Sequence, residues 1–162
     1  MSILFSPYTL SGLPLKNRVV MAPMTRARAL NDIPDELTVL YYRQRASAGL
    51  IISEGVPVSI QGRGYLFNPG LYNQEQVEGW KEVTQAVHEE GGKIFAQLWH
   101  VGRVSHTTLQ PDGGAPVSSS NRLAVNSMAY AYNEKHEPSP IQASPPRALS
   151  TEEVVNVKAD FV

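Results

Sequence analysis

Residues 35–53, DELTVLYYRQRASAGLIIS, decide the fold class that the sequence predicts. The first part predicts a helix over 35–48, because its larger apolar side chains recur at helical spacing. Gly49 follows at the position where a glycine commonly ends a helix. The run 50–53 is apolar up to its final serine, a pattern typical of a strand that is buried on both faces in a parallel sheet.

Strand and helix patterns flank this segment on both sides. Upstream, the β-branched run NRVVMA, 17–22, predicts a strand that is stopped by a proline. Downstream, Asn73 and Gln76 stand at capping-box spacing and begin a long helix that a pair of glycines ends. The segment KIFAQL, 93–98, then predicts a third strand.

The order of strand, loop, helix, strand, loop, helix and strand predicts βαβ units and a parallel sheet. A long irregular loop follows each strand, and the loops after the strands build the active sites of (β/α)8 barrels. A doubly wound sheet is the main alternative, but it would carry a glycine-rich turn where this chain has Ala22-Pro23-Met24-Thr25. We therefore predict an α/β fold, the first part of a (β/α)8 TIM barrel.

The remaining segments predict additions to this barrel. A long irregular stretch rich in Ser, Pro, Asn and Gly indicates a lid or capping subdomain, with β-hairpin content near 115–119 and 128–132. Ser150 opens a further helix with a capping box. The expected parts of the single domain are an N-terminal hairpin at 1–16, three β/α units at 17–100, the lid at 101–149 and the start of a barrel helix at 150–162.

Length sets an expectation about completeness. Three parallel strands do not close a barrel, and a typical (β/α)8 barrel needs about 250 residues, whereas this chain has 162. We therefore expect the rest of the barrel to come from a complementary C-terminal half, or the chain to be a piece of a longer protein.

Composition narrows the function classes. The net charge is −1 with no basic stripe, which argues against nucleic-acid binding. The absence of cysteine excludes disulfides, thiolate metal sites and a cysteine nucleophile. No apolar run is long enough to span a membrane, and the N-terminus lacks the features of a signal peptide. We expect a cytoplasmic protein.

Five ordered segments together resemble the old yellow enzyme family of FMN-dependent ene reductases, and within it bacterial N-ethylmaleimide and nitroester reductases. The resemblance runs along the whole chain. The segments are NRVVMAPMTR at 17–26, YYRQRASAGLIISE at 41–54, QLWHVGR at 97–103, APVS at 115–118 and PRAL at 146–149.

This resemblance implies an FMN-containing barrel reduced by NAD(P)H. It further implies reduction of the C=C bond of small activated alkenes, conjugated to a carbonyl or nitro group. The implied residues for the flavin ring are Ala22, Pro23, Met24, Thr25, Gly55 and Gln97. Thr25 would bond near the flavin O4–N5 edge, Gln97 would pair with the pyrimidine edge, and Gly55 would let the backbone approach.

Each assignment has a plainer alternative. Thr25 could cap a turn, Gln97 could satisfy local backbone, and Gly55 could serve a turn. The resemblance places Tyr65 and Trp99 along the substrate cavity, although aromatic side chains commonly fill cores.

Other polar residues support no further site. His100 and His106 lack the third ligand of a metal site, so we predict no metal. We interpret Arg26, Arg28 and Arg103 as structural. The family's substrate-oxygen pair, proton-donor tyrosine and phosphate site have no counterpart here. Two alternatives therefore remain open: an inactive folded fragment that needs its complementary chain, and an FMN-free phosphate-binding fragment.

Overall fold

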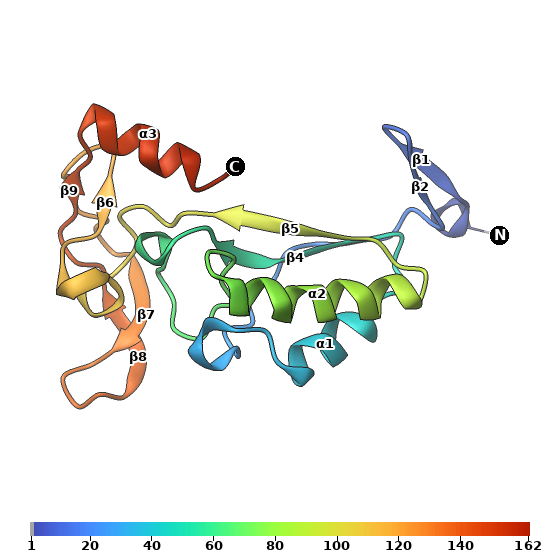
Figure 1. Cartoon of the computed structure of the whole chain (residues 1–162), viewed down its shortest axis with the longest axis horizontal. Coiled ribbons are helices and arrows are strands. Elements are labelled where there is room, and N and C mark those ends of the chain that lie inside the picture. Colours follow the sequence, from blue (N-terminus) through green and yellow to red (C-terminus); the bar gives the residue numbers. More distant parts are fainter. Residues whose placement is uncertain (1) are drawn as a thin grey trace.

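The computed structural model describes residues 2–162, so Met1 of the predicted N-terminal segment lies outside it. The chain has a mixed α/β fold. Its centre is a parallel sheet in the order β3 (Val20–Met21), β4 (Leu50–Pro57) and β5 (Ile94–Trp99). Helices α1 (Glu36–Arg43) and α2 (Gln74–Glu89) connect these strands and lie side by side on one face of the sheet (Figure 1).

The main core lies between the two helices and β4. Tyr42 from α1 and Trp80, Val83 and Val87 from α2 are buried against Ile51 and Val56 of β4. Full burial of side chains of this size contributes about 1.5–3 kcal/mol each. The packing explains why α1 and α2 are amphipathic and why β4 is buried throughout nearly all its length.

An irregularity in β4 sets which side chains face the core. The register with β5 shifts between Ile52 and Gly55, as in a β-bulge. Ile51 and Val56 therefore both face the helices, although five positions separate them, whereas a regular strand would turn them to opposite faces. Gly55 and its β5 partner Gln97 consequently lie on the face opposite the helices.

Three sequence-predicted boundaries need correction, and the first is that of the second strand, which the sequence predicts over 50–53 and which runs on to Pro57. The first strand extends over Val20–Met21 and not 17–22, because the Asn17 side chain turns the backbone by accepting from Val19 N–H and donating to Ser47 C=O. Helix α1 ends at Arg43 and not at residue 48, because turns with i→i−3 hydrogen bonds follow it. Gly49 is required by close approach, since a Cβ there would lie 2.1 Å from the Asn17 oxygen.

The start of α2 also differs from the predicted capping box. Asn73 accepts from Gln76 N–H as predicted, but the Gln76 side chain accepts from Tyr72 N–H. Gln76 is buried, so its amide ties the preceding loop to the helix.

Residues 101–149 form several short elements beside the sheet. Strands β7 (Met128–Tyr132) and β8 (Pro138–Gln142) make an antiparallel hairpin. Strand β6 (Val117–Ser118) pairs in parallel with β9 (Arg147–Ala148), so the hairpin expected near 115–119 is wrong: its partner lies about thirty residues away in the sequence. Leu66, Leu109, Ala129 and Ala131 form a second, smaller core here.

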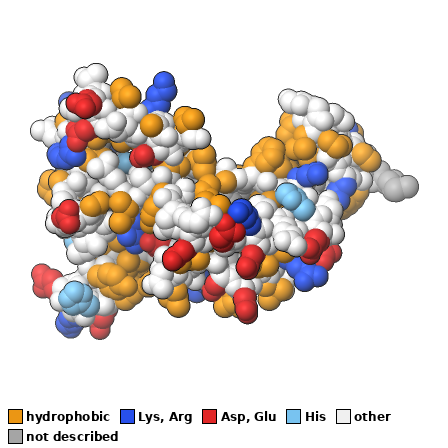
Figure 2. All heavy atoms as spheres, viewed as in Figure 1, with side chains coloured by type: hydrophobic (Ala, Val, Ile, Leu, Met, Phe, Trp, Pro, Cys, Tyr) orange, Lys and Arg blue, Asp and Glu red, His pale blue; other side chains and the backbone are white. Residues whose placement is uncertain are grey.

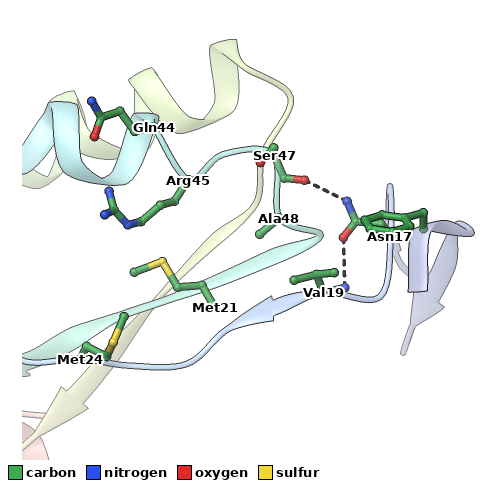
Figure 3. A pocket seen from close by; sticks show the side chains of 9 residues that line it. Asn17, Val19, Met21, Met24, Gln44, Arg45, Ser47 and Ala48 are labelled. Carbon is green, nitrogen blue, oxygen red and sulfur yellow. Dashed lines mark hydrogen bonds between the residues drawn. The ribbon is translucent and has the colours of Figure 1, made fainter. Parts of the chain in front are cut away.

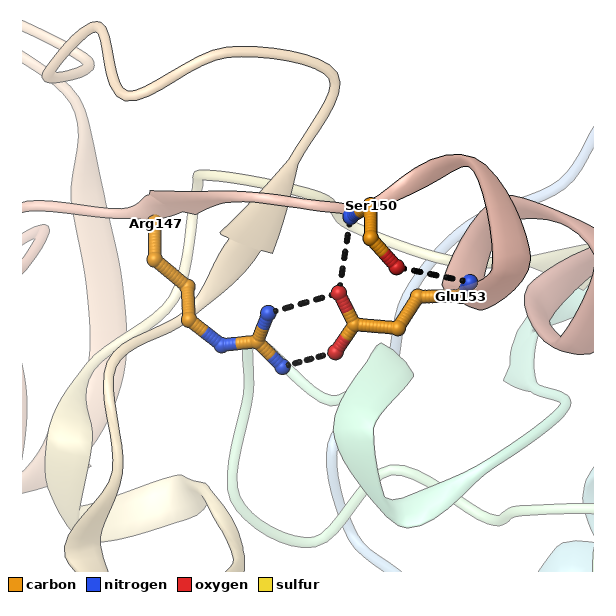
Figure 4. Close-up of polar contacts among 3 residues, drawn as sticks. All are labelled: Arg147, Ser150 and Glu153. Carbon is orange, nitrogen blue, oxygen red and sulfur yellow. Dashed lines mark hydrogen bonds and ion pairs between the residues drawn. The ribbon is translucent and has the colours of Figure 1, made fainter.

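The two ends of the chain carry separate elements. Strands β1 (Tyr8–Leu10) and β2 (Leu13–Leu15) pair antiparallel. Helix α3 (Thr151–Ala159) begins with a full capping box, in which Ser150 and Glu153 bond reciprocally while Arg147 holds both Glu153 oxygens (Figure 4). The remaining short elements are 3-10 turns at Ile3–Phe5, Leu30–Asp32, Ile60–Gly62, Thr107–Leu109 and Pro111–Gly113.

One side of the sheet lacks a helical cover within residues 2–162. Figure 1 shows α3 and the β1–β2 hairpin at opposite ends of β5, and Figure 2 shows a hollow between them. No residue of α3 is buried. Phe95 and Leu98 of β5 are both exposed, so the strand presents apolar side chains on both of its faces.

Candidate functional site

The carboxyl ends of the three parallel strands bring together three of the residues singled out in the sequence. Gly55 and Gln97 are direct partners in the β4–β5 ladder. Thr25 follows β3, and the amide of its neighbour Arg26 donates to the Glu54 carboxylate at 2.9 Å. Thr25, Gly55 and Gln97 thus come from adjacent strands at one edge of the sheet, where ligand sites of parallel α/β proteins lie.

The Thr25 segment is open to solvent. Ala22, Pro23, Met24 and Thr25 are all exposed, and Gln97 is partly exposed. Within residues 2–162, neither the Thr25 hydroxyl nor the Gln97 side-chain amide has a hydrogen-bond partner. Free donors and acceptors at adjacent strand ends fit the polar edge of a flavin ring, which presents both kinds of group. The residues present are therefore compatible with FMN.

Glu54 anchors the loop that carries Thr25. Its carboxylate accepts from the amides of Arg26 and Ala27, at 2.9 and 3.3 Å, and from the Tyr42 hydroxyl at 3.4 Å. Burial raises the pKa of Glu54, and the two backbone donors and the tyrosine oppose this rise. Burial and the adjacent carboxylate likewise raise the pKa of Tyr42. The bonds explain why a carboxyl group with only 3% exposure is tolerated here.

The Ser53 side chain replaces a backbone hydrogen bond that is missing at the β4 irregularity. Its hydroxyl donates to the Glu54 carbonyl at 2.7 Å and accepts from the Gln97 amide N–H at 3.1 Å. The Gln97 backbone is therefore held by a side chain where a regular ladder would use a carbonyl.

Gly55 meets an aromatic ring. A Cβ at this position would lie 2.5 Å from the Trp99 indole, so Trp99 requires the absence of a side chain here. The sequence analysis assigned the small residue to flavin approach. The structure shows that the close neighbour of Gly55 within this chain is Trp99, and flavin contact at Gly55 stays a prediction.

The two aromatic candidates lie together. The rings of Tyr65 and Trp99 stack with centroids 5.9 Å apart. Tyr65 also lines a surface pocket of about 410 Å³ with Arg26, Arg28 and the β7 residues Met128 and Tyr130. The β7–β8 hairpin reaches this place because Leu66 N–H donates to Tyr130 C=O and Tyr130 N–H donates to Gly64 C=O. The excursion after β5 thus forms one wall beside Tyr65.

A second pocket is lined by residues before and after α1, among them Met21 and Met24. It measures about 370 Å³, and Figure 3 shows Val19 and Ala48 beside the Asn17 hydrogen bonds, with Met21 and Met24 farther along the chain. Met24 therefore lies in a pocket with Met21 and with Gln44 and Arg45, which follow α1, and it does not line the Tyr65 pocket. Contact between Met24 and a flavin stays a prediction, and the Met24 backbone would make that contact.

Two histidines and two of the arginines singled out in the sequence have local partners. His100 Nδ1 accepts from Gly102 N–H, and burial lowers the pKa of this histidine. His106 accepts from Thr108 N–H. The Arg26 guanidinium lies over the Tyr41 ring, and Arg103 donates to the Arg122 carbonyl. Among residues 2–162, no three histidine or acidic side chains are grouped as metal ligands.

The sequence analysis missed Ser53, Glu54 and Tyr42. The available signal was a polar pair directly after the wholly apolar run 50–52, in a segment predicted to be buried on both faces. A buried carboxylate needs donors, and the loop after β3 supplies two of them.

The candidate ligand residues lie at the carboxyl ends of parallel strands in β/α units. This is where the active sites of α/β-barrel enzymes lie. A family model described as "NADH:flavin oxidoreductase / NADH oxidase family" matches residues 3–162. The chain belongs to this family of oxidoreductases.

Similar proteins of known sequence include plant reductases. The chain is 52% identical over 120 residues to 12-oxophytodienoate reductase 7 of Oryza sativa subsp. japonica, covering 74% of this chain and 30% of that protein. It is 43% identical over 159 residues to the putative 12-oxophytodienoate reductase 4 of the same plant, covering 98% of this chain and 39% of that protein.

Solved structures match over almost the whole of this chain. Morphinone reductase in complex with tetrahydroNAD superposes with a TM-score of 0.95 and 46% identity, over 99% of this chain and 44% of that one. The old yellow enzyme homologue from Zymomonas mobilis gives a TM-score of 0.89 and 40% identity, over 99% of this chain and 43% of that one. The chain thus spans less than half the length of these proteins. No helix within residues 2–162 has the length and apolarity to cross a bilayer.

Proposed function

We propose that this chain is the flavin-ring-binding part of an FMN-dependent ene reductase with a (β/α)8 barrel fold. The observation that carries the proposal is the meeting of Thr25, Gly55 and Gln97 at the carboxyl ends of three adjacent parallel strands. Family membership adds the flavin, and the names of the relatives add the reductase chemistry.

Each residue has a defined task in this proposal. The Thr25 hydroxyl donates a hydrogen bond to the flavin ring and stabilises the additional electron density of its reduced form. The Gln97 amide both donates and accepts, which suits the alternating pyrimidine edge. The exposed backbone of 22–25 lies along the ring. Bound FMN would supply hydride transfer from NAD(P)H to the activated C=C bond.

The substrate side is assigned to the stacked pair of Tyr65 and Trp99. Their rings exclude water from one wall of the cavity and offer flat apolar surfaces to a small conjugated alkene. The solved morphinone reductase complex contains tetrahydroNAD, which supports a nicotinamide reductant for this chain as well.

Completion of the site requires more protein in this proposal. The relatives are more than twice as long as this chain, and β5 leaves the apolar side chains of Phe95 and Leu98 exposed. A complementary C-terminal part would cover these side chains and supply the residues that bind the FMN phosphate, the residues for the substrate oxygen and the proton donor. A cytoplasmic location belongs to the same proposal.

The test combines this chain with a C-terminal part taken from a related barrel, either mixed or genetically joined. The proposal expects bound FMN, seen as a flavin absorption spectrum that remains after gel filtration, and oxidation of NAD(P)H that depends on an added enone or nitroalkene. The absence of both in a folded complex would reject it.

The alternative is a folded fragment without activity of its own. The exposed residues of α3 and β5 favour it. Gel filtration of the chain alone separates the two: the fragment hypothesis expects no retained flavin until the complementary part is added, and retained flavin on a monomer contradicts it.

A further inference from the structure

Two neighbouring residues of β4 hold the two polar candidates for flavin contact. Ser53 and Glu54 form the irregular part of the strand, where the register with β5 shifts. Both side chains are almost completely buried, at 0% and 3% exposure. Both side chains form hydrogen bonds with groups outside β4: Ser53 with the Gln97 amide and Glu54 with the Arg26 amide. The Ser53 hydroxyl also donates to the adjacent Glu54 carbonyl.

The Ser53 hydroxyl acts on β5. It accepts from Gln97 N–H at 3.1 Å and is oriented by donating to the Glu54 carbonyl. The bond fixes the backbone from which the Gln97 amide side chain extends. A strand without the irregularity would pair this N–H with a carbonyl, and Gly55 and Val56 would exchange faces.

The Glu54 carboxylate acts on the loop after β3. It accepts from two successive amides, Arg26 and Ala27, directly after Thr25. The positive φ of Ala27, 50°, shows a turn that a residue with a side chain adopts only when the surroundings impose it. The Tyr42 hydroxyl links Glu54 to α1 by two hydrogen bonds. It donates to the Glu54 carboxylate at 3.4 Å and accepts from the Glu54 backbone N–H at 2.8 Å.

We propose that the Ser53–Glu54 pair is a positioning device that sets the spacing between the Thr25 hydroxyl and the Gln97 amide across the flavin ring. Bulges near active sites commonly direct side chains in this way. The inference rests on the proposed flavin site but concerns residues that do not touch the flavin. Ser53 acts through Gln97, and Glu54 acts through the Arg26 and Ala27 amides.

The test uses this chain joined to a C-terminal part from a related barrel, and five variants. Ser53→Ala removes the hydroxyl, and Glu54→Met removes both acceptor oxygens at similar length. Two matched controls remove a buried polar group elsewhere. Ser59→Ala deletes a hydroxyl without a partner, and Gln76→Met deletes an acceptor of a backbone N–H.

Two measurements are made on each variant: residue-resolved amide hydrogen exchange without FMN, and FMN affinity by fluorescence titration. The proposal expects faster exchange at Gln97 only in Ser53→Ala, and at Arg26 and Ala27 only in Glu54→Met. It expects FMN to bind about three- to tenfold more weakly in Ser53→Ala and about tenfold or more in Glu54→Met, since each lost hydrogen bond changes an equilibrium by roughly this factor. Glu54→Gln, which keeps one acceptor oxygen, should recover part of the loss.

Two results would overturn the inference. The first is unchanged hydrogen exchange at these three amides. The second is FMN binding that weakens no more than in a control variant that unfolds at the same urea concentration. Failure of the unsubstituted protein to bind FMN would reject the proposed function instead, and it would be recognised before any variant is compared. In that case the amide exchange data would still decide whether the pair holds the two segments.

Discussion

The indole of Trp99 lies directly against the α-carbon of Gly55, so that a methyl group on Gly55 would come within 2.5 Å of the ring. The contact joins the ends of β4 and β5 and brings Trp99 into a stack with Tyr65. The absence of a side chain at Gly55 is therefore a condition for the position of both aromatic rings.

Gly55→Ala should displace the indole and lower the free energy of unfolding by about 1–3 kcal/mol, the usual cost of overpacking. Urea unfolding followed by tryptophan fluorescence measures the cost. In a Trp99→Leu background the same substitution should cost much less, because the ring is gone. Equal costs in the two backgrounds would show that the contact does not restrict this site.

Thr25→Val should lower the reduction potential of bound FMN by about 20 mV, because one hydrogen bond to the reduced flavin is worth about 1 kcal/mol and 30 mV corresponds to about 1.4 kcal/mol for two electrons. Redox titration measures the shift. Thr9→Val, an exposed threonine of β1, is the matched control. A potential equal to that of the control would remove Thr25 from the flavin edge.

Glu54→Gln should change how stability depends on pH. Burial raises the pKa of Glu54 above its ordinary value of 4.5, so the folded chain keeps this proton to higher pH than the unfolded chain. The contribution of Glu54 to the free energy of unfolding therefore falls as the pH rises from 4.5 through the raised pKa. Glutamine has no such proton.

The difference in unfolding free energy, unsubstituted protein minus Glu54→Gln, should accordingly decrease across that pH range and stay constant below it. Urea titrations at a series of pH values give this difference. An increase with pH would show that the carboxylate gains more from its donors than it loses by burial.

Ser150→Ala should unfold the start of α3 without disturbing the sheet. No residue of this helix is buried, so its capping box and the Arg147–Glu153 pair are its main supports (Figure 4). The Arg147 hydrogen bond lowers the pKa of Glu153 to about 2, so this support should persist from above pH 4.5 and weaken as the pH falls toward 2. Circular dichroism should show a loss of helix of up to the nine residues of α3, with an unchanged urea midpoint of the core.

Sequence patterns predicted the central elements because those elements are governed by local rules. Hydrophobic spacing identified α2, and the apolar run 50–52 identified a doubly buried strand. The three strands form the expected parallel sheet, and solved structures with high TM-scores support the family assignment.

Long-range geometry lay beyond those patterns. The parallel partner of Val117–Ser118 is distant in the sequence, so a hairpin was the wrong expectation. Helix α1 ends early because i→i−3 turns follow it, and the small residue at Gly49 is required by its approach to the Asn17 backbone and not by a helix end. The roles of Ser53 and Glu54 depend on the strand irregularity, because only a shifted register brings the Ser53 hydroxyl to the Gln97 amide.

The most direct measurement of the central claim is a titration of FMN into this chain joined to a C-terminal part from a related barrel, with the visible difference spectrum as the readout. The account predicts a saturable spectral change at one FMN per chain, strongly weakened by Gln97→Leu and unaffected by Gln85→Leu, a glutamine on the outer side of α2. A titration without a saturable change, or one in which both variants bind as tightly as the unsubstituted protein, would contradict the assignment of this strand edge to the flavin.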